Sequence, residues 1–126
     1  MRPTEQLLTG RVNGQRLISG SNTYETLMRP GSDKENYVFL PNNITTEEDL
    51  KQHIFKVFPY FPETIYPMLQ HFYPLPKNSQ GRYSDMLGRL ASISGELILN
   101  CPSYWLAQAF PADHSYHYEW QSTIHT

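Results

Sequence analysis

Apolar residues recur every three or four positions through the middle of the chain, a spacing that predicts helices. Thr45 followed three residues later by Glu48 predicts a capping box at the start of the first helix. One helical face then carries the apolar positions Leu50, Ile54, Val57 and Phe58. Pro59 is expected to end this helix, because proline cannot supply the next backbone donor.

Two further helices are predicted after it. One covers Ile65 to Tyr73, with Pro67 in the first turn, where a missing donor costs little. The other follows a polar loop at 77–81. Its apolar face is formed by residues spaced four, three and four positions apart: Met86, Leu90, Ile93 and Leu97. Pro102 fits either a kink or the first turn of a new helix, and the sequence leaves both open.

Two short segments have the alternation of strands. Arg16 to Ser19 is expected to form a strand that ends at Gly20, within a loop-rich first third of the chain. Ser115 to Trp120 predicts an aromatic strand with Tyr116, Tyr118 and Trp120 on one face. The order strand, helices, strand predicts an α/β protein with a parallel sheet. Two strands are too few for a stable sheet, so the remaining strands are expected to be missing.

Composition limits the classes of function. The chain has 126 residues, enough for one domain or part of one, and a formal net charge of -2. This charge gives no reason to expect a nucleic acid or an anionic membrane as a partner. No apolar run is long enough for a transmembrane segment, and the first residues do not resemble a secretory signal.

Single features leave the compartment open. Cys101 is the one cysteine, so it is either a buried thiol or paired with another chain. Asn43, Ile44 and Thr45 form a glycosylation sequon, which matters only in the secretory pathway. A metal site at Asp113, His114, His117 and His125 is not expected, because a strand would place His114 and His117 on opposite faces.

Several segments together resemble the fungal branch of the type B carboxylesterase and lipase family, which has the α/β-hydrolase fold. They are 10–14, 17–25, 43–50 and, most specifically, Cys101 to Ala109, which is similar to the family's C-P-S-Y-W-L-A-E-A helix. Nearly the whole chain is covered. The resemblance implies that residues 1–126 form a partial carboxylesterase domain, its C-terminal portion, without a cofactor.

The same resemblance implies two residues of a catalytic triad. The family's acid lies in a segment written approximately G-x-N-x-x-E-G, which Gly20 to Glu25 matches, so Glu25 is the expected acid. Thr26 stands where the family has glycine. The family's histidine follows the last aromatic strand, which gives His125 as one candidate and a residue beyond Thr126 as the other.

The nucleophile is not in the sequence: no serine lies in a G-x-S-x-G elbow, and there is no glycine-rich oxyanion loop. The chain is therefore expected to be inactive alone and to contribute to hydrolysis of a carboxylic ester only within a longer serine esterase. The alternative is a truncated or degenerate non-catalytic protein that folds or binds only with a partner chain. In either case, exposed apolar helix faces predict self-association. Secretion follows from the resemblance alone.

Overall fold

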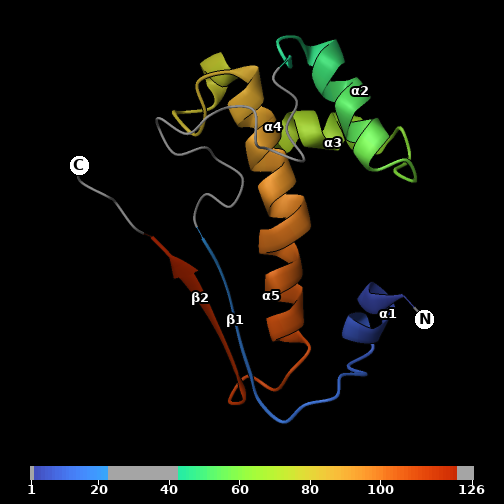
Figure 1. Ribbon diagram of the computed structural model, residues 1–126, viewed down its shortest axis with the longest axis vertical. Coiled ribbons are helices and arrows are strands. Elements are labelled where there is room, and N and C mark those ends of the chain that lie inside the picture. Colours follow the sequence, from blue (N-terminus) through green and yellow to red (C-terminus); the bar gives the residue numbers. More distant parts are fainter. Residues whose placement is uncertain (1, 23–42, 122–126) are drawn as a thin grey trace. The chain divides into compact units, whose positions relative to one another are not determined.

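The computed structural model is mainly helical, with one small parallel sheet (Figure 1). It describes residues 2–22 and 43–121. The elements in chain order are α1 Pro3–Leu8, β1 Leu17–Asn22, α2 Glu47–Val57, α3 Ile65–Phe72, the 3-10 helix η2 Pro76–Asn78, α4 Met86–Gly95, the π-helix η3 Glu96–Asn100, α5 Cys101–Gln108 and β2 Ser115–Trp120.

The chain divides into two compact units. Unit 1 comprises residues 1–25 and 95–126, and unit 2 comprises residues 26–94. Among described elements, unit 1 contains α1, β1, η3, α5 and β2, whereas unit 2 contains α2, α3, η2 and nearly all of α4.

The predicted capping box exists one residue later than expected. Thr46, not Thr45, is the N-cap of α2: its hydroxyl accepts from the Asp49 amide at 3.1 Å, and the Asp49 carboxylate accepts from the Thr46 amide at 2.8 Å. Three acidic residues in the first turn also suit the positive end of the helix dipole. The helix ends at Val57 with Phe58 as its C-cap, one residue earlier than the apolar pattern predicts and just before Pro59.

In unit 2, the helical periodicity matches part of the buried positions; Val57, predicted on the same face as Leu50 and Ile54, is 36% exposed. Leu50 and Ile54, one turn apart on α2, are each 1% exposed, and Leu90 and Ile93 on α4 are equally buried. In α3, Pro67 lies in the first turn, as expected. The apolar stripes therefore meet in a core, which accounts for the folding of this unit.

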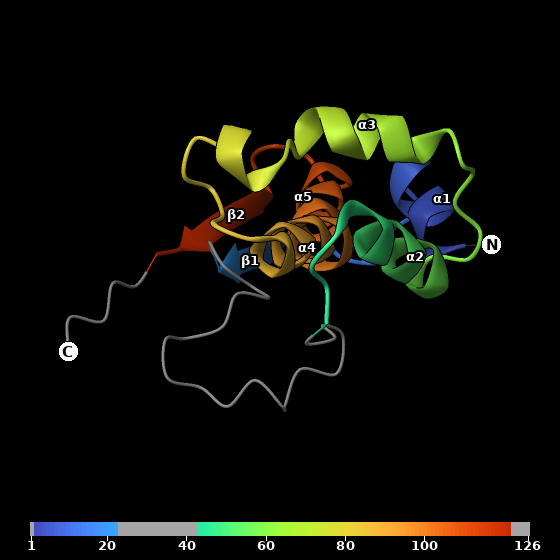
Figure 2. The same ribbon diagram turned by 90° about the horizontal axis from the view of Figure 1, so that it is seen from above.

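Unit 1 contains the sheet. β1 and β2 pair in parallel, with Leu17 opposite Ser115 and Asn22 opposite Trp120. The two strands lie side by side, with α5 next to them, in both views (Figure 1, Figure 2). β2 has the predicted bounds, but β1 continues past Gly20, where the sequence pattern had ended it. Glycine suits this strand position because the ring of Tyr118 lies directly above it. A Cβ at residue 20 would lie 2.4 Å from that ring, so a larger residue would not fit without a shift.

Helical residues continue from α4 through η3 into α5 without an intervening loop. The third predicted helix therefore ends at Gly95 as an α-helix, and Leu97 belongs to the π-helix. Pro102 lies in the first turn of α5, which agrees with one of the two alternatives. Proline has no amide hydrogen to donate within a helix, and both prolines and π-bulges are sites where the regular hydrogen-bond ladder of a helix is interrupted. α1 was not predicted, although Pro3 at its first turn and Glu5 are start signals.

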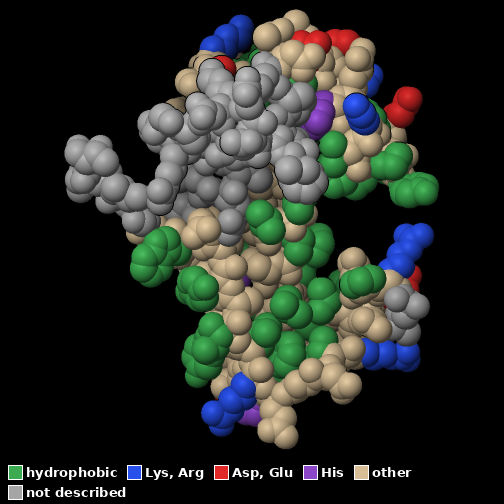
Figure 3. Space-filling view, in the orientation of Figure 1, with side chains coloured by type: hydrophobic (Ala, Val, Ile, Leu, Met, Phe, Trp, Pro, Cys, Tyr) green, Lys and Arg blue, Asp and Glu red, His purple; other side chains and the backbone are tan. Residues whose placement is uncertain are grey.

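The two units differ in their cores. Among the described residues, every buried hydrophobic side chain belongs to unit 2: Ile44, Leu50, Ile54, Tyr66, Leu69, Tyr73, Tyr83, Leu90, Ala91 and Ile93. Unit 1 instead exposes large apolar side chains on both the sheet and α5, visible as green groups in Figure 3. Its elements are thus assembled without the apolar burial that usually stabilises a sheet.

Candidate functional site

The two residues expected to belong to a triad, Glu25 and His125, lie outside the described residues. The strands that lead to them are described. β1 ends at Asn22, three residues before Glu25, and β2 ends at Trp120, five residues before His125. Because the strands are parallel and Asn22 is opposite Trp120, both strands end at the same edge of the sheet. In open α/β sheets, ligands bind beyond this carboxyl edge.

Hydrogen bonds hold α5 against the strand pair. The Ser19 hydroxyl of β1 donates to the Ser103 carbonyl at 3.2 Å, and the Ser115 hydroxyl of β2 donates to the Ala107 carbonyl at 2.8 Å. Both donors occupy odd-numbered strand positions, as does His117, so they share one sheet face. This face is the polar side of the sheet, and α5 covers it.

A serine and a histidine meet on this face. Ser103 Oγ lies 2.9 Å from His117 Nε2, and both residues are half-buried. The imidazole also stacks on Tyr104, with 3.8 Å between ring centroids and 21° between ring planes. The stacked tyrosine and the serine together fix the orientation of His117.

The geometry of Ser103 argues against a nucleophile. Its Oγ also lies 2.7 Å from the Asn100 carbonyl, which can only accept. A hydroxyl has one proton, so when that proton goes to Asn100 the serine oxygen accepts from Nε2-H of His117. Nucleophilic activation needs the reverse transfer, with Nε2 accepting the serine proton. Ser103 also lies within α5, whose amides are used in the helix, so it has no oxyanion donors beside it.

We therefore expect the Ser103–His117 hydrogen bond to stabilise the packing of β2 against α5. Ser103→Ala should accelerate amide exchange in β2 by about fivefold, because a neutral hydrogen bond contributes about 1 kcal/mol. Hydrogen exchange measured by mass spectrometry on the 115–120 segment tests this. Ser84→Ala, at an exposed serine of unit 2, is the matched control. Unchanged exchange in the Ser103 variant would refute this stabilising role.

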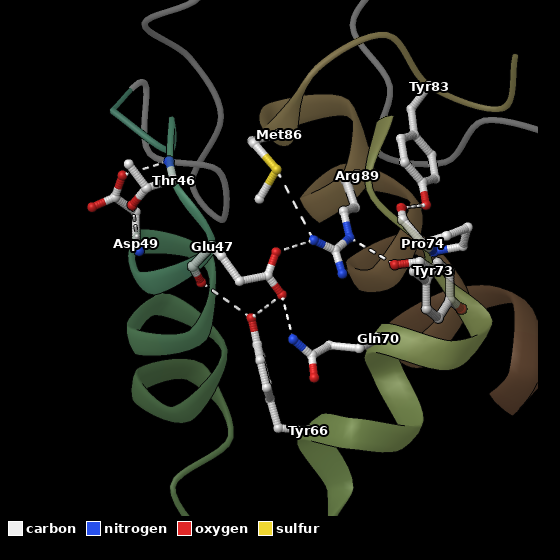
Figure 4. A network of polar contacts seen from close by, with 10 residues as sticks. All are labelled: Thr46, Glu47, Asp49, Tyr66, Gln70, Tyr73, Pro74, Tyr83, Met86 and Arg89. Atoms are coloured by element: carbon white, nitrogen blue, oxygen red, sulfur yellow. Dashed lines mark hydrogen bonds and ion pairs between the residues drawn. The ribbon is translucent and has the colours of Figure 1, made fainter. Parts of the chain in front are cut away.

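Unit 2 contains a second polar cluster, centred on Arg89 of α4 (Figure 4). The Arg89 side chain is 2% exposed and forms an ion pair with Glu47, the first residue of α2. Its Nε donates to the Tyr73 carbonyl at 2.8 Å. Glu47 in turn accepts from the Tyr66 hydroxyl at 2.9 Å and from the Gln70 amide at 3.0 Å. The carboxylate thus joins α2, α3 and α4.

The protonation of Glu47 is set by this cluster. Partial burial acts to raise its pKa, but hydrogen bonds from Arg89, Gln70 and Tyr66, with the charge of Arg89, outweigh burial and lower the pKa below the usual value. Burial and the Glu47 charge raise the pKa of Tyr66. Both carboxylate oxygens are occupied by donors from the chain itself. The cluster is therefore suited to structural stability, not to substrate chemistry.

The remaining candidate groups do not form a metal site. Within residues 2–22 and 43–121, no three His, Cys, Asp or Glu side chains come together as metal ligands. Burial and the nearby charge of Glu96 raise the pKa of Cys101, which disfavours the reactive thiolate. No helix in the described part of the chain is both long and apolar enough to cross a membrane.

Sequence reasoning did not identify Ser103, His117 or Arg89 as interacting residues. The alternation in β2 contained a signal for one of them: with Tyr116 and Tyr118 on the outer face, His117 had to lie on the face toward a covering helix. No local pattern indicates that Arg89 and Glu47, 42 positions apart, form an ion pair.

Comparisons of the chain with protein-family models, with curated proteins and with solved structures found no match.

Proposed function

We propose that this chain provides the C-terminal part of a serine carboxylic-ester hydrolase, with Glu25 as the acid of the triad and His125 as its base. The observation that supports this most is the parallel β1–β2 pair, whose strand ends lie opposite each other just before these two residues. The incomplete sheet is the second support. A parallel sheet is normally covered on both faces and continued by further strands, and unit 1 has neither among its described residues.

Chain geometry permits the two side chains to meet. Adjacent strands are about 5 Å apart, and an extended chain advances at most about 3.5 Å per residue. The three residues after Asn22 and the five after Trp120 thus span at most roughly 10 Å and 18 Å. A carboxylate and an imidazole that start from neighbouring strand ends are within this range of each other.

The proposed chemistry assigns each group one task. The Glu25 carboxylate accepts a hydrogen bond from the His125 imidazole, fixes its tautomer and stabilises its protonated form. The imidazole removes the proton of a serine hydroxyl supplied by the upstream part of the enzyme. That oxygen attacks the ester carbonyl, the alcohol leaves with the proton, and water then hydrolyses the acyl-serine.

Complementation tests the proposal. The partner is an N-terminal polypeptide of a type B carboxylesterase that contains the G-x-S-x-G elbow and ends before the segment equivalent to 10–14. We expect hydrolysis of p-nitrophenyl butyrate only when the two chains are mixed, because neither has a complete triad. The same partner with alanine at the elbow serine is the control.

The outcomes separate the alternatives. Turnover in the mixture supports the esterase proposal. Association of the two chains without turnover supports the non-catalytic alternative, which Thr26 and Thr126 also favour because each replaces a family glycine next to a site residue. No association would contradict both.

A further inference from the structure

One motif of the sequence takes no part in the proposed esterase chemistry. Asn43, Ile44 and Thr45 form the triplet that acceptors of N-linked glycans share: an asparagine, any residue except proline, and a hydroxyl residue. No other asparagine of the sequence has serine or threonine two positions later. Because a glycan is bulky and hydrophilic, it requires an acceptor on the protein surface, and the local structure of the triplet is therefore decisive.

The acceptor lies on the surface of unit 2. Asn43 is exposed and lies in a turn, three residues before Thr46, the N-cap of α2. The next residue, Ile44, is only 7% exposed, and Thr45 is exposed again. The central residue thus anchors the triplet in the core, while the residues on either side of it lie outside. A glycan on Asn43 is compatible with this core, because it replaces a hydrogen atom of an exposed side chain.

The hydroxyl residue of the triplet takes part in the cap of α2. The Thr45 hydroxyl and the Thr45 amide both donate to Oδ2 of Asp49, each at 3.1 Å. The same carboxylate accepts from the Thr46 amide, a contact drawn in Figure 4. An enzyme that recognises the triplet by its hydroxyl must therefore compete with Asp49 for the Thr45 side chain in the folded protein.

The unfolded chain has no such competition. Thr45 meets Asp49 only when the first turn of α2 has formed, and a single helical turn is unstable without the rest of its unit, because helix nucleation is unfavourable. Until unit 2 folds, the hydroxyl of Thr45 and the side chain of Asn43 are both accessible to a transferase.

We propose that Asn43 is an N-glycosylation site, and that the glycan is added before the cap of α2 forms. The nitrogen of the Asn43 side-chain amide forms a bond to the anomeric carbon of an oligosaccharide carried on a polyprenyl diphosphate. The bond between that carbon and the diphosphate breaks, the polyprenyl diphosphate leaves, and the amide nitrogen loses one proton. The transferase and its donor belong to the secretory pathway, so the proposal places the chain there. It does not depend on esterase activity.

Mass spectrometry of the protein from its source cells tests the site. Peptide-N-glycosidase converts a glycosylated asparagine to aspartate, and in heavy-oxygen water the new carboxylate carries a label. The label should appear at Asn43 in most copies of the chain. It should be absent from Asn78, an exposed asparagine of unit 2 outside any such triplet, and from a sample that received no enzyme. An unlabelled Asn43 would overturn the proposal.

Variants identify the triplet as the cause. The full chain is produced in a eukaryotic host behind a cleavable secretory signal, and cells and medium are both analysed, so that a variant that folds poorly still reports on the site. Thr45→Ala should remove the glycan, whereas Thr45→Ser, which keeps the hydroxyl, should retain it. A glycan on the Thr45→Ala chain, or none on the unmodified and Thr45→Ser chains, would contradict the assignment.

Transfer to the folded chain measures the order of events. The unglycosylated chain and a synthetic peptide of residues 40–48 are each mixed with the purified transferase and its lipid-linked donor. The folded chain should react about tenfold more slowly than the peptide, because the hydrogen bonds between Thr45 and Asp49 must open first. Asp49→Ala removes their acceptor and should recover part of this difference. Equal rates for folded chain and peptide, or no gain from Asp49→Ala, would overturn the proposed order.

Discussion

Glu47→Ala should lower the free energy of unfolding of unit 2 by about 3 kcal/mol. The expected loss arises from Arg89, whose side chain is 2% exposed. Without Glu47, the positive charge of Arg89 would be buried without an opposite charge beside it. Glu47 itself is 35% exposed, which places the effect at the lower end of those measured for buried pairs. Hydrogen exchange of the amides of α2 and α4 measures this loss within unit 2.

Two variants isolate the ion pair. Glu48→Gln changes the neighbouring, exposed carboxylate, whose Oε1 accepts a hydrogen bond from the Gln52 side chain one turn later, and should cost less than about 0.5 kcal/mol. Glu47→Ala combined with Arg89→Met removes both charges and should recover much of the stability lost in the single variant. If the double variant were as unstable as the sum of the two single variants, the charge argument would be wrong.

Acidification should act on the same carboxylate. The pKa of Glu47 is lower in the folded state than in the unfolded state, so its contribution is fully present above the unfolded pKa of about 4.3. This contribution to the free energy of unfolding is lost as the pH falls from the unfolded pKa through the lower pKa of the folded state. Asp49, whose pKa is lowered by hydrogen bonds from Thr46 and Thr45, acts in the same direction. Below about pH 4.5 the double variant should therefore lose less stability than the unmodified chain.

Glu25→Gln should reduce kcat of the complemented esterase by about a thousandfold or more, with little change in KM. Glutamine keeps the shape of the side chain but cannot stabilise a protonated imidazole, and in a comparable triad the amide costs about 10⁴-fold in kcat. Hydrolysis of p-nitrophenyl butyrate at a range of pH values measures the loss. Glu25→Asp keeps the charge, so it should retain substantially more activity.

Glu63→Gln is the matched control for this variant. Glu63 is an exposed carboxylate in unit 2, and its replacement should leave kcat within about twofold, because an exposed surface residue has no part in the transition state. Equal activity of the Glu25→Gln and unmodified enzymes would remove Glu25 from the triad.

Local patterns predicted the elements that depend on local chemistry. The apolar stripe of α2 and the alternation of β2 each gave the correct element, and β2 has the predicted bounds. The helix start was displaced by one residue because Thr45 and Thr46 are both capable N-caps. Both donate to the Asp49 carboxylate, but it is the Thr46 hydroxyl that accepts from the Asp49 amide. A pattern of residue types does not distinguish two adjacent threonines.

Tertiary contacts determined what the sequence did not predict. The end of β1 was placed too early because a glycine, considered from the local sequence alone, favours a turn at the end of a strand. In the structure, Gly20 lies within the strand and makes room for the ring of Tyr118 on β2. The π-helix lies directly before α5, whose second residue is Pro102, and no pattern of residue types had indicated it. The Ser103–His117 contact depends on α5 lying on one particular face of the sheet, which becomes known only once the strands are paired.

The long separation of β1 and β2 along the sequence also affects how the molecule is made. On the ribosome, β1 emerges well before its partner, whereas α2, α3 and α4 emerge between the two strands and make contacts that are close in sequence. Local contacts form quickly and distant strand pairs slowly, so unit 2 should fold while β1 is still without its partner. Throughout this interval the chain exposes an unpaired strand, and chaperone binding during synthesis should therefore map to the 17–22 segment.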